Sequence, residues 1–198
     1  DKQVSDLKGK PDVSLCASAP EFRIVERDLI ENFVKKGYHI DAIQKWICER
    51  FANGLKTVIN DFDFILIDCP PGISLFAEAA LIAADAILVP TIPDYVSRLG
   101  LITFRKRALR SMEQRRFTDE RIWTLITKFE DHNTLHASEA AMLKEQFHVF
   151  DTRIPQAEQI ARAAEWSEQR RTLEQKYGAS AQVIRCFAAE FRELAGLI

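Results

Sequence analysis

The sequence lacks the residue patterns that mark several common kinds of binding site. Its seven glycines are scattered singly along 198 residues, so no glycine-rich loop can be drawn from it. The formal net charge of −2 gives no overall positive field that would attract nucleic acid. No apolar run approaches the roughly 20 residues of a membrane-spanning helix. No Cys-x-x-Cys spacing exists, which argues against zinc and thiol-redox motifs, because the four cysteines are far apart: Cys16, Cys48, Cys69 and Cys186.

The composition is that of an ordinary globular protein. Hydrophobic residues make up 47% of the chain and charged residues 28%, and the length suffices for one domain with a core. Strand-like and helix-like segments alternate, which predicts an α/β fold with a doubly wound, mostly parallel sheet flanked by helices. We therefore expect a single domain over residues 1–198. Expected strands are 13–17, 64–67, 86–89, 122–126 and 149–150, and expected helices are 20–33, 40–58, 75–84, 97–113, 138–147, 157–167 and 179–194.

One stretch carries the strongest functional pattern. The continuous apolar run 64–67 ends in Asp68, and two prolines and Gly72 follow closely. Such a run is typical of a strand covered on both faces, and the prolines turn the chain out of the sheet. The pattern predicts that Asp68 lies at the carboxyl end of a central strand, where open α/β sheets place their ligands. A carboxylate there suits hydrated Mg²⁺. The alternative is a buried strand followed by a capping aspartate.

Later segments at matching spacings extend this pattern. The segments are Asp68-Cys69-Pro70-Pro71, Leu81-Ile82-Ala83-Ala84-Asp85, Pro93-Asp94-Tyr95, Leu125-Ile126-Thr127-Lys128-Phe129 and Ile154-Pro155-Gln156. Together they resemble the ParA/MinD family of P-loop ATPases, which partition plasmids and chromosomes or position cellular machinery. The resemblance covers residues 55–194 well and the first fifty residues weakly.

The resemblance implies a set of functional expectations. Asp68 would be the Walker B carboxylate, acting in catalysis and holding Mg²⁺ through water. Thr127, Pro155 and Gln156 would line an adenine pocket of bound ATP; ordinary strand-end loops are the alternative at these three positions. ATP would promote a homodimer, and hydrolysis, stimulated by a partner protein, would release it. With phosphate chemistry in view, reduced thiols in a cytoplasm are expected.

The phosphate-binding loop of the family is missing from the sequence. The deviant Walker A loop reads Lys-Gly-Gly-x-Gly-Lys-Thr and surrounds phosphates with backbone N–H groups and lysines. The nearest imitation here, Lys8-Gly9-Lys10-Pro11, has one glycine and a proline where the family has threonine. We expect that the chain is truncated and that the loop lies upstream of Asp1, in which case the protein is an ATPase. The alternative is a degenerate interaction module that binds no nucleotide.

DNA binding is a further expectation from the resemblance. Family members often bind nonspecific DNA through surface Arg and Lys residues, but His132 and Gln156 stand where some relatives have arginine. A separate basic patch is expected on the helix over 97–113, with Arg105, Lys106 and Arg110 facing solvent. A solvated helix face is the alternative interpretation of this patch.

Overall fold

The computed structural model describes residues 4–6, 13–18, 22–70, 72, 74–111, 118–163, 165 and 171–196. The chain forms two compact units, residues 1–83 and residues 84–198, and each is described by itself. A parallel sheet flanked by helices confirms the α/β fold class. The expectation of a single domain over residues 1–198 stays a prediction.

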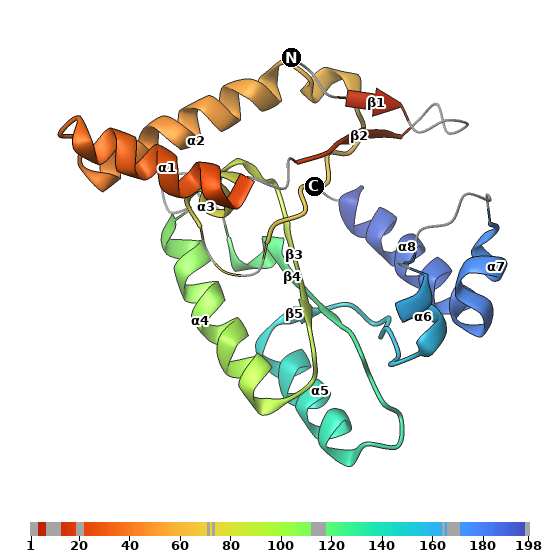
Figure 1. The fold of residues 1–198 in the computed structure, drawn as a ribbon. Helices are drawn as coiled ribbons and strands as arrows, with labels where there is room; N and C mark the ends of the chain where they lie inside the picture. The colour runs from red at the N-terminus through yellow and green to blue at the C-terminus, as the bar shows by residue number, and fades with distance from the viewer. Residues whose placement is uncertain are drawn as a thin grey trace. The chain divides into compact units, whose positions relative to one another are not determined.

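In the described residues, the first unit holds a pair of short strands, three α-helices and one short 3-10 helix (Figure 1). Strands β1 (Val4–Asp6) and β2 (Ser14–Cys16) pair antiparallel. Helices α1 (Phe22–Lys35) and α2 (Ile40–Lys56) follow, then the short helix η1 (Ile59–Asp61) and α3 (Leu75–Ala83). Gly37 follows α1 with a φ of +84°, and the N–H of Tyr38 donates to the carbonyl of Phe33 at 3.1 Å, which closes the end of the helix.

The core of the first unit lies between its helices. Ile43 and Ile47 of α2 are buried against Ala79 of α3, with Phe33 of α1 packed beside them. The apolar spacing of three and four residues in α2 places these side chains on one face of the helix. The carboxylate of Glu26 accepts the N–H of Leu75 at 2.6 Å, which ties α1 to the first turn of α3. This hydrogen bond joins two helices that are far apart in the sequence.

The predicted central strand over residues 64–67 is wrong for the described structure. This segment is irregular and largely exposed, and the exposed fraction of Leu66 reaches 79%. An apolar run becomes a buried strand only when other strands take up its backbone hydrogen bonds and helices cover its faces. Among the described residues, no strand pairs with this segment. The apolar run predicted a strand, but the run by itself does not show whether neighbouring strands are present to pair with it.

The second unit is built on a parallel sheet of three strands (Figure 1). Strands β3 (Ile87–Thr91), β4 (Ile122–Ile126) and β5 (His148–Val149) lie in that order, with β4 in the centre. Ile87 pairs with Ile122, and Trp123 pairs with His148. The connections are α4 (Tyr95–Ser111), the short helix η3 (Asp119–Arg121) and α5 (Thr134–Gln146). The carboxyl ends of these strands therefore meet at one edge.

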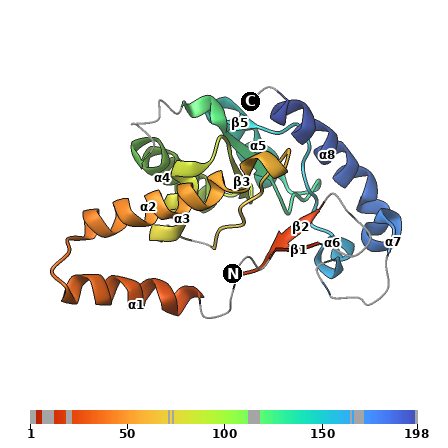
Figure 2. The same cartoon turned by 90° about the horizontal axis from the view of Figure 1, so that it is seen from above.

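Helices cover both faces of this sheet. On one face, Ile126 packs with Leu101 of α4 and Leu143 of α5. On the other face, Leu125 packs with Phe150 and with the apolar side of α8 (Ala181–Ala195). Neighbouring residues of β4 point to opposite faces, so one strand contributes to both cores. Figure 1 shows α4 and α8 on opposite sides of the strands, and Figure 2 gives the view from above.

Three shorter elements and one boundary differ from expectation. Helix α6 (Glu158–Arg162) is shorter than predicted, and α7 (Leu173–Tyr177) and η4 (Gly178–Ser180) were not predicted. Thr172 caps α7 with a capping box that includes Gln175, a signal readable from the sequence. Helix α5 begins at Thr134 rather than Ser138, because Asn133 accepts the N–H groups of Leu135 and His136.

Candidate functional site

The loops that leave β4 and β5 lie side by side at the carboxyl edge of the sheet. The N–H of Phe129 donates to the carbonyl of Ile154 at 3.0 Å, and the N–H of Gln156 donates to the carbonyl of Phe129 at 2.9 Å. Phe129 and Pro155 form a parallel bridge. The ladder of the sheet thus continues past its named strands into both loops. Two segments that sequence reasoning had linked only by resemblance are joined here by backbone hydrogen bonds.

Thr127 connects this edge to β3. Its N–H donates to the carbonyl of Thr91 at 2.8 Å, and its hydroxyl lies 3.4 Å from the same oxygen. Thr127 and Pro155 are half-buried and Gln156 is exposed. The structure therefore brings together the segments that carry all three residues expected in an adenine pocket. A partly covered, partly open edge is the kind of place where parallel sheets bind ligands.

The backbone at this edge has one unusual conformation. Lys128 has a φ of +54°, which falls in the left-handed region that residues with a side chain seldom adopt. The residue lies directly after Thr127, and its side chain is exposed. Backbone strain of this kind costs on the order of 1 kcal/mol and clusters at functional sites. The conformation turns Phe129 back into the core, where it is buried.

The ring of Phe129 contacts two side chains with nitrogen-containing groups. The guanidinium of Arg153 lies 4.7 Å above its ring, and the ring of His136 lies 6.1 Å from it, centroid to centroid. A cation over an aromatic face is attracted by the negative face of the ring. Arg153 precedes Ile154 and Pro155, so this contact also fixes the loop after β5 against the loop after β4.

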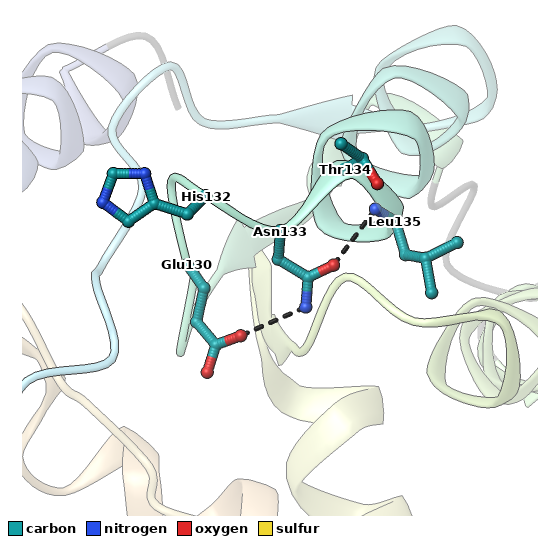
Figure 3. A pocket seen from close by; sticks show the side chains of 5 residues that line it. All are labelled: Glu130, His132, Asn133, Thr134 and Leu135. Carbon is teal, nitrogen blue, oxygen red and sulfur yellow. Dashed lines mark hydrogen bonds between the residues drawn. The ribbon is translucent and has the colours of Figure 1, made fainter.

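An open hollow of about 550 Å³ lies beside these loops at the start of α5 (Figure 3). Its lining residues are Glu130, His132, Asn133, Thr134 and Leu135. In the figure Asn133 stands at the centre, bonded to both Glu130 and Leu135, while His132 points away from Leu135. The imidazole Nδ1 of His136 accepts the N–H of Glu130 at 3.2 Å. These bonds fix the loop that bounds the candidate site.

Asp94 follows β3 at the same edge and begins α4. Its carboxylate accepts the N–H of Ser97 at 2.8 Å and the hydroxyl of Ser97 at 2.9 Å. The hydrogen bond from the Ser97 N–H is the main reason why the pKa of Asp94 is lowered below its ordinary value. Both oxygens of this carboxylate are thus engaged in capping the helix.

Asp68 lies in the first unit, in the irregular segment after residue 67. It is exposed, and no hydrogen bond or ion pair is seen for it within the described ranges. It does not end a central strand in the described structure, because residues 64–67 form no strand there. Partial desolvation and the Asp68 carboxylate raise the pKa of the Cys69 thiol, which disfavours the reactive thiolate. Part of the Pro70-Pro71 turn lies outside the described residues.

The described residues contain no cluster of three His, Cys, Asp or Glu side chains that could hold a metal by themselves. A Mg²⁺ ion needs less from the protein, since it keeps several waters and takes one or two carboxylates plus phosphate oxygens. The carboxylate of Asp68 is exposed, so its oxygens are accessible to such an ion.

The three basic residues of the expected patch on α4 are not equivalent. Lys106 and Arg110 are exposed. Arg105 is not simply facing solvent: it donates to the carbonyl of Gln146 at 2.6 Å, and its guanidinium lies 4.5 Å above the ring of Phe147. Arg105 therefore ties α4 to the end of α5. The prediction that all three side chains face solvent is corrected for this residue.

One residue that contacts this edge was missed by sequence reasoning. Glu190 of α8 accepts the N–H groups of Asp151 and Thr152, immediately before the loop that carries Pro155 and Gln156. Nothing in the local sequence marks it, because it is one of two acidic residues on an amphipathic helix.

No helix in the described part of the chain is both long enough and apolar enough to cross a membrane.

Comparison with known proteins gives a consistent set of relatives. A family model described as an AAA domain matches residues 11–118, just over half of the chain. The chromosome partitioning protein ParA of Myxococcus xanthus is 38% identical over 52 residues, 26% of this chain and 18% of that protein. The sporulation initiation inhibitor protein Soj of Bacillus subtilis is 28% identical over 117 residues, 58% of this chain and 46% of Soj.

A third relative is the septum site-determining protein MinD of Thermotoga maritima, which is 29% identical over 119 residues, 58% of this chain and 41% of MinD. The chain spans less than half the length of the curated relatives with the longest matches.

Proposed function

The chain belongs to the AAA domain family, among the ParA/MinD-type P-loop ATPases, and on this premise we propose that the complete protein binds ATP at the carboxyl edge of the β3–β4–β5 sheet. The observation that carries the proposal is the backbone pairing of the loop 127–130 with the loop 154–156. This pairing gives the segments of Thr127, Pro155 and Gln156 a common edge. In our proposal these residues line the adenine side of the nucleotide.

The phosphates and the metal need other parts of the protein. The sequence has no glycine-rich loop, so the complete protein has to supply one for tight binding. Asp68 would hold Mg²⁺ through water, and its exposed carboxylate leaves room for a hydrated ion. When bound, the metal offsets negative charge on the phosphates. Asp68 would contribute the negative charge that keeps the ion in place.

The cellular role follows from the same premise. The relatives include proteins named for chromosome partitioning and septum-site determination. We propose that the complete protein is a nucleotide-controlled switch of this kind, which forms a homodimer with ATP and separates after hydrolysis stimulated by a partner protein. Nonspecific DNA is a proposed ligand of the exposed basic residues Lys106 and Arg110. A cytoplasmic location is part of this proposal.

Calorimetry with ATP and Mg²⁺ tests the nucleotide proposal on the complete protein. Replacing Gln156 by Ala and, separately, Thr127 by Val should weaken ATP binding, because both changes remove polar groups beside the adenine. Gln182→Ala is the matched control, since Gln182 is an exposed glutamine on α8. No binding of ATP by the complete wild-type protein would favour the alternative, an interaction module without nucleotide.

A further inference from the structure

Glu190 contacts the backbone of the loop after β5 through both oxygens of its carboxylate. One carboxylate oxygen accepts the N–H of Asp151 at 2.5 Å, and the other accepts the N–H of Thr152 at 3.0 Å. Hydrogen bonds to an ionised acceptor are shorter and stronger than those between neutral groups. A single side chain thus satisfies two consecutive backbone donors that would otherwise need water or another acceptor.

The helix that carries Glu190 packs against the sheet through aromatic side chains. Phe187 and Phe191 of α8 belong to the apolar group that packs on Leu125 and Phe150 of the sheet. The rings of Phe150 and Phe187 lie 5.4 Å apart in an edge-to-face arrangement. Glu190 lies one turn from Phe187 and is itself half-buried. Its carboxylate therefore has a fixed position relative to the strands.

The loop is also held from the other face of the sheet. The ammonium of Lys144 on α5 lies 2.7 Å from the carboxylate of Asp151. This ion pair lowers the pKa of Asp151, and the hydrogen bond from Lys144 is its largest cause. Asp151 is consequently tied to α5 through its side chain and to α8 through its backbone. Of these two ties, only the one from Glu190 reaches the backbone of Thr152 as well.

The residues that follow form the edge of the candidate nucleotide site. Arg153 stacks on Phe129, and Ile154 donates its N–H to the carbonyl of Ile126 at 2.9 Å. Pro155 and Gln156 then run beside the loop after β4. Glu190 thus fixes the backbone one residue before this stretch begins. A change in its contact is transmitted along a short, hydrogen-bonded segment.

We propose that Glu190 is a positioning residue for the adenine side of the nucleotide site. It acts through the backbone of residues 151–156 and touches neither the nucleotide nor the metal. The proposal rests on the proposed ATP site, and it makes α8 the element that sets the width of that site on the side of the base. Its loss should affect recognition of the base and leave recognition of the phosphates unchanged.

The test compares two ligands on the complete protein with Mg²⁺: ATP, and inorganic tripolyphosphate, which has no base. The variants are Glu190→Ala, Glu190→Gln and the control Glu193→Ala, which removes an exposed carboxylate from the same helix. Glu190→Ala should weaken ATP binding about tenfold, as expected for the loss of charge-assisted hydrogen bonds. Binding of tripolyphosphate should stay within about twofold of wild type.

Hydrogen exchange of the Asp151 and Thr152 amides supplies a measurement that needs no ligand. Exchange should be at least about tenfold faster in Glu190→Ala, because both donors lose their acceptor. Glu190→Gln should be intermediate in both measurements, since its amide oxygen accepts one N–H while its NH₂ group faces the other. This second variant keeps the size of the side chain if the alanine variant is poorly folded.

The outcomes separate the two proposals. Faster exchange with an ATP-to-tripolyphosphate affinity ratio equal to wild type would show a purely structural residue and overturn this inference alone. An unchanged exchange rate would also overturn it. If the wild-type protein binds neither ligand, the ATP site itself fails, and this inference falls with it. Faster exchange together with a loss confined to ATP supports the inference.

Discussion

The carboxylate of Asp94 caps α4 by accepting both the N–H and the hydroxyl of Ser97, at 2.8 Å and 2.9 Å. Asp94 is the third residue after the end of β3, so this cap sets where the helix begins at the edge of the sheet. The same contacts give the residue a lowered pKa. The contribution of this cap to the stability of the protein therefore depends on pH.

Asp94→Ala should lower the free energy of unfolding by about 1 kcal/mol at pH 7, as is usual for the loss of an N-cap. The folded-state pKa lies below the ordinary value of 3.8, so this contribution is fully present above that pH and is lost as pH falls through the folded pKa. Urea denaturation of both proteins at pH 7 and at pH 3 checks this. An equal difference at both pH values would contradict the ionic part of the cap.

Unlike the carboxylate of Asp94, the hydroxyl of Thr124 has no hydrogen-bond partner within the described residues. Its side chain is fully buried in β4, and its hydroxyl is the single such atom found unpaired within the described ranges. Thr124→Val replaces the hydroxyl by a methyl group of similar size, so it should raise the free energy of unfolding by about 1 kcal/mol. Thr124→Ser keeps the hydroxyl, leaves a cavity and should destabilise the protein. Denaturant titration distinguishes the two, and a destabilised valine variant would indicate a buried water at this position.

Several elements could be predicted from the sequence because their patterns are local. The apolar spacing that predicted a helix over residues 40–58 depends on neighbours in the chain, and α2 confirms it. β4 was predicted over residues 122–126, as observed, since its apolar residues lie between turn signals. The start of α5 was misplaced at Ser138, because two residues of capping type lie near the start of the helix and the sequence does not show that Asn133 accepts the N–H groups of Leu135 and His136.

Other features depend on contacts between distant segments. The run 64–67 has the composition of a central strand, yet a strand forms only where partners supply hydrogen bonds. Thr127 and Gln156 were linked by resemblance, whereas the pairing of their loops follows from the parallel ladder beyond β4. Glu190 could not be predicted, because an acidic residue on a helix surface carries no sign of the backbone donors opposite it.

Asp68 is expected to matter for hydrolysis and little for folding. In the complete protein, Asp68→Ala should reduce the Mg²⁺-dependent ATPase rate by about a hundredfold or more, because charge stabilisation by a metal is worth several kcal/mol. Its circular dichroism should match wild type, since the residue is exposed. Asp63→Ala is the control, an exposed aspartate in the same segment. A near-normal rate in Asp68→Ala would remove Asp68 from the site.

The basic surface of α4 makes a separate prediction about DNA. Each neutralised phosphate adds about −0.9 to the slope of log affinity against log salt, so Lys106→Ala/Arg110→Ala should reduce the magnitude of the slope by about 1.8 per protomer. Arg105 is left unchanged, because it holds Gln146 and Phe147. Lys35→Ala/Lys36→Ala is the charge-matched control, at the last residue of α1 and the exposed residue that follows it. An equal slope in wild type and Lys106→Ala/Arg110→Ala would identify a solvated helix face.

Photolabelling with 8-azido-ATP tests the central claim most directly, because the reactive group is on the adenine. The complete protein would be labelled with Mg²⁺ present, digested, and mapped by mass spectrometry, with and without excess ATP. The account predicts labelled peptides that contain residues 127–130 or 154–156, and loss of that label with excess ATP. Label that excess ATP removes only from peptides elsewhere in the protein would contradict an adenine site between these two loops.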